Sequence, residues 1–364
     1  MTTARIILSK AGRRKGLGKD SEIFKKCLES HGFEVVIEHT TITNIIGPDN
    51  NTIYDLQIFL ENIFSSYLPY GRYNALMVNQ DISFIGPPEA IDIYICKTKY
   101  CQQKLRDFLD KRGLDTRIIY TSFFTPSSGE PILKEKKPFA LHAAGDSPYK
   151  STIELMNLWK KHPEWPPLYV IGPKWYNIVV ADNIITYPDY ISSSQLQNLQ
   201  RSAYLYVCPS SKEGWGHYID EGRINAVPII TTNAPPMNEL CRYSSLLVDV
   251  DRMEEDHKIL QHNLDAHYFY FDEKSMEKAM DRFLRMSPQE REEEGLRNLR
   301  AYQEDRDYFQ NQGMKQLTDI FEKYSNSFQA NNYTTKVKHT PLKLSLLVLL
   351  AVIVIITVYY WKKK

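Results

Sequence analysis

Short apolar runs alternate along most of the chain with segments in which apolar residues recur at helical spacing. The runs predict strands at residues 5–8, 33–37, 75–78, 91–96, 117–120, 139–144, 168–171, 203–209, 228–232 and 244–250. The periodic segments predict helices at residues 20–31, 100–112, 152–162, 194–202, 217–226 and 277–324. Because strands and helices alternate, we expect parallel sheets covered by helices, which is the α/β class.

The alternation is interrupted once, over residues 126–138, where Pro, Ser, Gly and Lys gather in a turn-rich stretch typical of an interdomain linker. A chain of 364 residues is long enough for two domains that each bury a core. The pattern therefore predicts two Rossmann-like, doubly wound domains.

The last apolar run is different in kind. Residues 344–361 are uncharged over about the length that spans a bilayer as a helix, and lysines stand on both sides. They predict a transmembrane helix, preceded by a polar tether at residues 326–343. A span at this end leaves the ribosome only after synthesis, so we expect a single-pass tail anchor with the folded domains in the cytosol.

The charge balance argues against nucleic-acid binding, and the cysteine spacing argues against a cysteine metal site. The chain has 45 basic and 44 acidic residues, whereas a nucleic-acid binder that works through a basic face needs a clear basic excess. The five cysteines stand in apolar or helical contexts without the paired spacing of a metal site. We therefore expect buried free thiols and no nucleic-acid partner.

The densest chemistry lies between Ser210 and Glu239. The run at residues 203–209 predicts a buried strand, so the loop that carries Glu213, Gly214 and Gly216 leaves the carboxyl end of that strand. A helix follows and carries Glu221. Open α/β sheets bind ligands outside the carboxyl ends of their strands, and a helix N-terminus there favours phosphate.

This segment resembles the donor-sugar signature of retaining glycosyltransferases of the GT-B fold, family 4, through the E-x7-E spacing, the following AVPIITT and Glu239. Gly222 replaces the usual alanine, and residues 225–228 replace a glycine-before-proline pattern. The resemblance implies two Rossmann-like domains that face a cleft. The expected divisions are residues 1–130 (acceptor side), 131–308 (nucleotide-sugar side), 309–325 (a helix packing back on the first domain), 326–343 (tether) and 344–361 (membrane).

The resemblance also implies roles for the signature residues. Glu221 would accept hydrogen bonds from the ribose hydroxyls, and Glu213 would hold hydroxyls of the transferred sugar as the catalytic glutamate. Amides near Gly214, Trp215 and Gly216 would approach the sugar or the diphosphate. Transfer requires that charge be stabilised on the departing diphosphate, and such groups supply that stabilisation.

A cation is the other requirement. Gly145 opens the loop after the strand at 139–144, and Lys150 has a position that resembles the phosphate-binding lysine of the family. The family usually places an arginine directly after the glycine, but here that residue is Asp146. Lys174 is a second candidate for the missing charge.

The first domain offers a further loop, from Gly12 to Gly18, between a strand and a helix that Asp20 or Ser21 is expected to cap. In similar glycosyltransferases the first loop touches donor phosphate or acceptor, so Gly16 and Gly18 are expected at the donor. Arg13 and Arg14 also stand in this loop and could supply charge across the cleft.

Four acidic or basic residues have competing interpretations. Asp81 follows the strand at 75–78 and could orient an acceptor hydroxyl, or only close a turn. His142 lies within an apolar run and is expected in the core. Asp249 and Asp251 match the metal motif of the GT-A fold, but they close an expected strand after the E-x7-E loop. We therefore expect no metal and no cofactor.

The expected function is a metal-independent, retaining hexosyltransferase. It would move a sugar from a nucleoside-diphosphate donor to a glycan or lipid-linked acceptor near a membrane. Two other functions stay open: a GT-B nucleotide-sugar epimerase, and an inactive membrane-tethered adaptor, which the absent arginine beside Gly145 favours. Two carboxylates would also suit a glycosidase.

Overall fold

The computed structural model describes residues 2–12, 16–41, 47–48, 51–79, 88–127, 136–172, 179–187, 191–255, 264 and 267–321. The chain divides into two compact units, Met1–Asp319 and Ile320–Lys364, and the following description concerns the first. The predicted domain boundaries at residues 130, 308 and 325 stay predictions.

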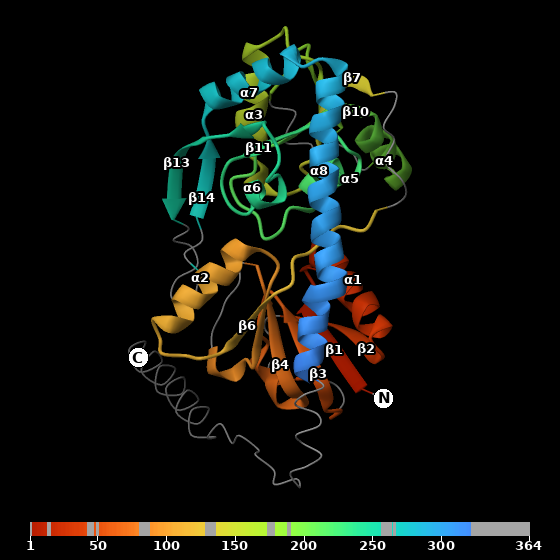
Figure 1. Cartoon of the computed structure of the whole chain (residues 1–364), viewed down its shortest axis with the longest axis vertical. Coiled ribbons are helices and arrows are strands. Elements are labelled where there is room, and N and C mark those ends of the chain that lie inside the picture. Colours follow the sequence, from red (N-terminus) through yellow and green to blue (C-terminus); the bar gives the residue numbers. More distant parts are fainter. Residues whose placement is uncertain are drawn as a thin grey trace, which may run out of the picture. The chain divides into compact units, whose positions relative to one another are not determined.

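The first half of this unit folds around one parallel sheet (Figure 1). Its six strands pair in the order β2-β1-β3-β4-β5-β6. They are β1 (Thr2–Ser9), β2 (Phe33–Thr40), β3 (Tyr54–Leu60), β4 (Gly71–Val78), β5 (Ile93–Cys96) and β6 (Arg117–Tyr120). Helices α1 (Gly16–Ser30) and α2 (Lys99–Asp110) follow β1 and β5. Apolar residues of the strands, such as Phe59 and Tyr94, pack against Leu105 and Leu109 of α2.

The second half repeats this architecture with strands in the order β12-β11-β10-β7-β8-β9, all paired in parallel. The strands are β7 (Lys137–His142), β8 (Leu168–Ile171), β9 (Ile184–Tyr187), β10 (Ala203–Cys208), β11 (Ile229–Thr232) and β12 (Leu247–Val248). The helices are α3 (Thr152–Lys161), α4 (Ser193–Ser202), α5 (His217–Ile224), α6 (Met237–Leu240) and α7 (Glu273–Arg285). The α/β class and the two Rossmann-like sheets that the sequence predicts are confirmed.

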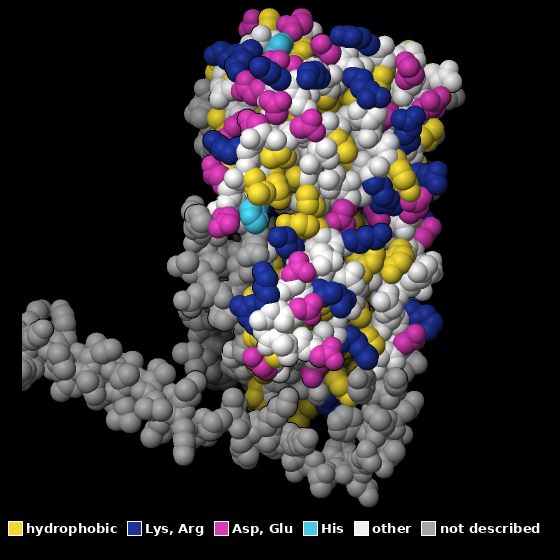
Figure 2. Space-filling view, turned by 60° about the vertical axis from the view of Figure 1, so that its left-hand side comes forward, with side chains coloured by type: hydrophobic (Ala, Val, Ile, Leu, Met, Phe, Trp, Pro, Cys, Tyr) yellow, Lys and Arg dark blue, Asp and Glu magenta, His cyan; other side chains and the backbone are white. Residues whose placement is uncertain are grey.

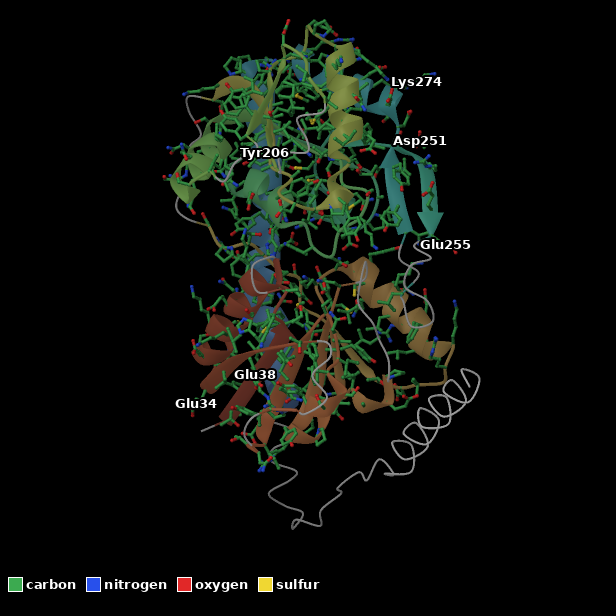
Figure 3. All side chains as sticks on the ribbon, turned by 180° about the vertical axis from the view of Figure 1, so that it is seen from behind. Glu34, Glu38, Tyr206, Asp251, Glu255 and Lys274 are labelled. Carbon is green, nitrogen blue, oxygen red and sulfur yellow. The ribbon has the colours of Figure 1, made fainter. Side chains whose placement is uncertain are left out.

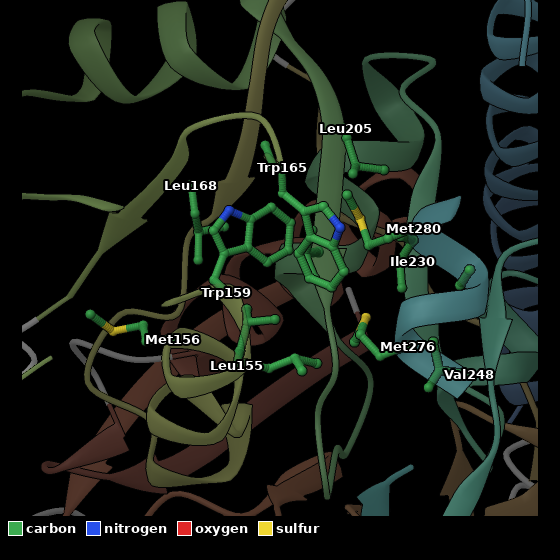
Figure 4. Close-up of a cluster of buried hydrophobic side chains, with 14 of the residues drawn as sticks. Leu155, Met156, Trp159, Trp165, Leu168, Leu205, Ile230, Val248, Met276 and Met280 are labelled. Atoms are coloured by element: carbon green, nitrogen blue, oxygen red, sulfur yellow. The ribbon is translucent and has the colours of Figure 1, made fainter. Parts of the chain in front are cut away.

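The core of this second half is rich in large side chains (Figure 4). Trp159 of α3 and Trp165 pack edge to face with ring centroids 4.8 Å apart. Leu205 and Ile230 contribute from the sheet, and Met276 contributes from α7. This cluster fixes β7 and β10, whose carboxyl ends carry the candidate site.

A long helix, α8 (Pro288–Tyr308), runs from the second sheet toward the first (Figure 1). It continues through a π-helical turn, Phe309–Gly313. Phe309 is fully buried and contacts Phe24 and Phe123 of the first half. The last helix of the described chain thus contacts the first half at Phe309, and the predicted helix at residues 309–325 that packs back on the first domain stays a prediction.

Several elements differ from the sequence prediction. Strands β3 and β9 were not predicted, and neither was an antiparallel ribbon of β13 (Val250–Glu255) and β14 (His267–Phe271). The helical span expected at 277–324 is divided at Ser287, which forms a capping box for α8 with Pro288 in its first turn. Helix α1 begins at Gly16, so Asp20 and Ser21 do not cap it.

The expected membrane helix at residues 344–361 and its tether lie outside the described residues. Within the described part of the chain, no helix is both long enough and apolar enough to cross a membrane.

Candidate active site

The loop after β10 places the first signature glutamate in a buried setting. Glu213 is 8% exposed, and its Oε1 accepts a hydrogen bond of 2.5 Å from Ser210 Oγ. The same oxygen accepts a hydrogen bond from Nζ of Lys150. A buried carboxylate needs such partners, so its position is fixed from two sides.

Lys150 reaches this point from the neighbouring strand. β7 ends at His142, and Gly145 adopts φ +57°, a value that favours glycine. Lys150 ends the short turn Pro148–Lys150. Because β7 and β10 are paired, both loops open at the same edge of the sheet. The predicted residues Lys150 and Glu213 are therefore brought together, and Gly145 lies in the loop that leads to Lys150.

Tyr218 of α5 completes this cluster. The Lys150 ammonium lies 4.0 Å from the centroid of the Tyr218 ring, and the Tyr218 hydroxyl is hydrogen-bonded to Ser210 Oγ. Burial raises the pKa of Tyr218 well above its usual value, so the phenol stays neutral. Sequence reasoning missed Ser210 and Tyr218, although both lie inside the signature segment.

The second signature glutamate has different partners. Glu221 lies on α5 and accepts hydrogen bonds from Gln200 Nε2 at 2.6 Å and from Lys19 Nζ at 3.3 Å. Lys19 belongs to α1 of the first half. The two glutamates thus occupy separate positions, one in the loop and one on the helix.

The glycines and the tryptophan of the signature serve mainly to shape the turn. Gly216 precedes α5 with φ +112°, which a side chain would strain. Gly214 lies in the preceding bend. The Trp215 indole is buried and donates to Asp220 Oδ2 at 2.8 Å, so its ring points into the protein and not toward a ligand. Donor contacts from Gly214, Trp215 and Gly216 stay predictions that involve their amides.

The start of α1 faces the start of α5. A Cβ added at Gly16 would lie 3.4 Å from Cδ2 of His217, an ordinary van der Waals distance, so the two helix starts are close neighbours. Gly18 stands in the same first turn of α1, in place of the loop that the sequence predicts. Asp20 accepts from His217 Nε2 at 2.8 Å and from Lys97 Nζ at 2.9 Å.

Asp20 is therefore a buried ion-pair partner. Burial alone would raise its pKa, but the charge of Lys97 and the hydrogen bond from His217 lower the pKa of Asp20 to about 2. No sequence signal identifies this role, since Lys97 lies 77 positions away.

A second buried network involves Asp220 of α5. Asp220 accepts from the Thr125 amide at 2.9 Å and pairs with Arg223 at 2.6 Å, and Arg223 also pairs with Asp305 of α8. An acid on the otherwise apolar face of a helix was the available sequence signal. This network ties the segment after β6 to α5 and α8.

The third glutamate of the resemblance, Glu239 in α6, caps another helix. Its carboxylate accepts from the amides of Lys99 and Tyr100 at 2.9 and 2.8 Å, which are the first residues of α2. Burial raises the pKa of Glu239.

The structure describes His142, Asp249 and Asp251, three of the residues with competing interpretations. His142 is fully buried, and its ring nitrogens bond to the Val207 carbonyl and Thr152 Oγ1, so the predicted core role is confirmed. Asp249 separates β12 from β13, and Asp251 lies in β13. Among the described residues, no group of His, Cys, Asp and Glu side chains could hold a metal ion.

Four predicted residues lie outside the described part of the chain. They are Arg13, Arg14, Asp81 and Lys174. Their expected roles stay predictions.

Comparison with known proteins identifies the fold of the chain. No family model and no curated protein matches the chain. Sucrose-phosphate synthase from Thermosynechococcus elongatus has a TM-score of 0.63 at 11% identity, covering 90% of this chain and 100% of that one. Trehalose-6-phosphate synthase from E. coli, bound with UDP-2-fluoro glucose, has a TM-score of 0.60 at 10% identity, covering 88% and 99%.

A third solved structure agrees with these two. α,α-Trehalose 6-phosphate synthase from Burkholderia multivorans has a TM-score of 0.54 at 12% identity and covers 78% of this chain and 74% of that one. At identities this low, the likeness concerns the arrangement of the elements. The chain therefore has the GT-B fold of these synthases, with two Rossmann-like sheets.

Proposed function

We propose that the protein is a retaining glycosyltransferase that moves a sugar from a nucleoside-diphosphate sugar to a glycan or lipid-linked acceptor. The observation that carries this proposal is the Lys150–Glu213 pair at the carboxyl edge of the second sheet, directly before the N-terminus of α5. The shared fold with sugar-phosphate synthases, one of them bound to a UDP-sugar analogue, supports it.

The cation and the helix supply what the leaving group needs. As the bond to the anomeric carbon breaks, negative charge gathers on the diphosphate, and the Lys150 ammonium with the first amides of α5 would stabilise it. Contacts with Glu213 and the Tyr218 ring hold Lys150 in place before a donor arrives. Such pre-organisation lowers the barrier because little rearrangement is needed during transfer.

The glutamates would act on the two ends of the donor. Glu213, next to Lys150, would accept hydrogen bonds from hydroxyls of the transferred sugar. Glu221 lies on α5, after the loop that carries Glu213, and would accept hydrogen bonds from the ribose hydroxyls. Lys19 and Gln200 hold its carboxylate in position. The transfer needs no divalent ion in this scheme, because lysine and backbone amides neutralise the diphosphate.

The test uses the full-length chain purified in detergent with a panel of nucleotide sugars and acceptors, with and without EDTA. We expect one donor to release its nucleoside diphosphate in EDTA, and NMR to show that the product keeps the anomeric configuration of the donor. Lys150→Ala should lower turnover about 100-fold, whereas Lys160→Ala, an exposed lysine of α3, should leave it unchanged. An inverted product, or activity only with added metal, would contradict the proposal.

A second candidate rests on Asp146. This residue is exposed directly after Gly145, where similar glycosyltransferases have an arginine. A site with one cation fewer could bind nucleotide sugars without transferring them, as an adaptor. Tight donor binding without diphosphate release, in the presence of the whole acceptor panel, would favour this candidate.

We also propose that the acceptor lies at a membrane surface. The apolar segment at residues 344–361 would hold the catalytic domains near a lipid surface, which favours a lipid-linked or membrane-presented acceptor.

A further inference from the structure

The antiparallel ribbon β13–β14 contacts the signature loop directly. The Phe269 amide of β14 donates to the Ser211 carbonyl at 2.8 Å. Ser211 in turn donates from its own amide to the Tyr149 carbonyl at 2.9 Å, and its hydroxyl donates to the same oxygen at 3.2 Å. Tyr149 is the residue directly before Lys150. A continuous chain of backbone contacts therefore runs from the ribbon to the catalytic lysine.

Lys212 connects the segments that these contacts join. It stands between Ser211 and Glu213, and only 3% of the residue is exposed. Its ammonium lies 5.1 Å from the ring centroid of Tyr149 and 4.8 Å from that of Tyr268 on β14. The two rings are themselves 5.8 Å apart. A desolvated ammonium is attracted by the faces of both rings, so one side chain links three separate segments.

The connection between the two strands of the ribbon has a contact of its own. Leu264, between the two strands, is 2% exposed and belongs to the hydrophobic cluster of the first half that includes Leu105 and Phe108 of α2. The strand β13 carries exposed charges, and Figure 3 shows Asp251 and Glu255 near its two ends. The ribbon is thus anchored by its contacts with the first half and with the signature loop.

We propose that Lys212, held between Tyr149 and Tyr268, is a positioning residue that transmits the position of the β13–β14 ribbon to the Lys150–Glu213 pair. This inference rests on the proposed function. It goes beyond that function because the proposed transfer involves neither the ribbon nor Lys212 nor Tyr268. Turnover should therefore depend on the aromatic ring at position 268, although this ring does not touch Lys150.

The test compares Tyr268→Leu, Tyr268→Phe, Lys212→Met and Lys212→Arg in the full-length chain, with Lys274→Met as a matched control. Lys274 is exposed at the start of α7 (Figure 3). Two readouts are needed: hydrogen exchange of the Ser211 amide without nucleotide, and turnover with the donor found in the panel. Thermal unfolding shows that each variant is folded.

We expect Tyr268→Leu and Lys212→Met to raise exchange at Ser211 about tenfold and to lower kcat by about 10- to 100-fold. Tyr268→Phe keeps the ring and Lys212→Arg keeps the cation, so both should retain wild-type exchange and kcat, as should the control. Unchanged exchange in Tyr268→Leu would overturn the inference with or without a known donor. Faster exchange with unchanged kcat would also overturn it. A wild-type protein that processes no donor would instead overturn the proposed function.

Discussion

Single residues of this protein carry roles that local sequence cannot reveal. Asp20 has the sequence context of a helix cap, yet α1 begins four residues earlier and Asp20 pairs with Lys97 and His217. Glu213 and Lys150 were singled out through the resemblance to the glycosyltransferase signature, and their side chains pair in the structure, while their roles at a donor stay predictions. The position of Lys212 was not predictable, because Tyr149 and Tyr268 belong to segments that precede and follow it by more than fifty residues.

The buried Asp20 predicts a pH dependence of stability. Its pKa is lowered from 3.8 to about 2 in the folded protein, so the ionised form is stabilised by folding. This contribution, about 2 kcal/mol, is present above pH 4 and is lost as the pH falls toward 2. Urea unfolding of wild type and Asp20→Asn should therefore show a large difference in the free energy of unfolding at pH 7.

That difference should shrink as the pH is lowered below 4, since protonated Asp20 is neutral like asparagine. Asp55→Asn, at a half-buried aspartate of β3, provides a comparison. A difference between wild type and Asp20→Asn that stays constant from pH 7 to pH 3 would contradict the account.

At the scale of elements, most strands were predictable from their apolar runs, and β10 is apolar throughout. The strand β9, which has only four residues, was missed. β3 contains Gln57, which is fully buried and accepts from Arg5 Nε at 3.0 Å, so polar residues interrupt its pattern. The β13–β14 ribbon was missed because β13 carries alternating charges that are typical of exposed segments.

The packing of α8 on the loop after α5 predicts the effect of a small change. A Cβ at Gly295 would lie 2.0 Å from the Ala226 carbonyl oxygen, a backbone atom that cannot move aside. Glycine to alanine usually stabilises a helix interior by about 1 kcal/mol. Here we expect Gly295→Ala to destabilise the protein by about 3 kcal/mol or more, as overpacking does.

Thermal and urea unfolding measure this effect, with Glu292→Ala as the control on an exposed position of the same helix. The control should change the free energy of unfolding by less than about 0.5 kcal/mol. A Gly295→Ala protein as stable as wild type would show that α8 does not pack so closely.

At the scale of the whole molecule, basic and acidic residues are balanced at the surface as they are in the sequence. Basic and acidic side chains are interspersed on the face that Figure 2 shows, which agrees with the balanced composition. The two parallel sheets were predictable from the alternation of strands and helices, although one strand of each, β3 and β9, was missed. The contacts between the two halves, such as Glu239 on the start of α2, were not, because they join residues about 140 positions apart.

The expected tail anchor gives a prediction of topology. If residues 344–361 span a membrane and the folded domains are cytosolic, the sequon at Asn50 stays unmodified in a eukaryotic host. The full chain should sediment with membranes after carbonate washing, and a chain ending at residue 343 should not. A glycosidase-sensitive shift that Asn50→Gln abolishes would contradict the cytosolic orientation.

The central claim is that Lys150 and the start of α5 form a diphosphate site. Calorimetric titration of nucleoside diphosphates into the full-length chain in EDTA tests it most directly, with Lys150→Ala and the control Lys160→Ala. We expect one diphosphate to bind wild type and Lys160→Ala equally, and to lose about 2 kcal/mol or more, about 30-fold in Kd, with Lys150→Ala. Equal binding to wild type and Lys150→Ala, or binding of no diphosphate to wild type, would contradict the account.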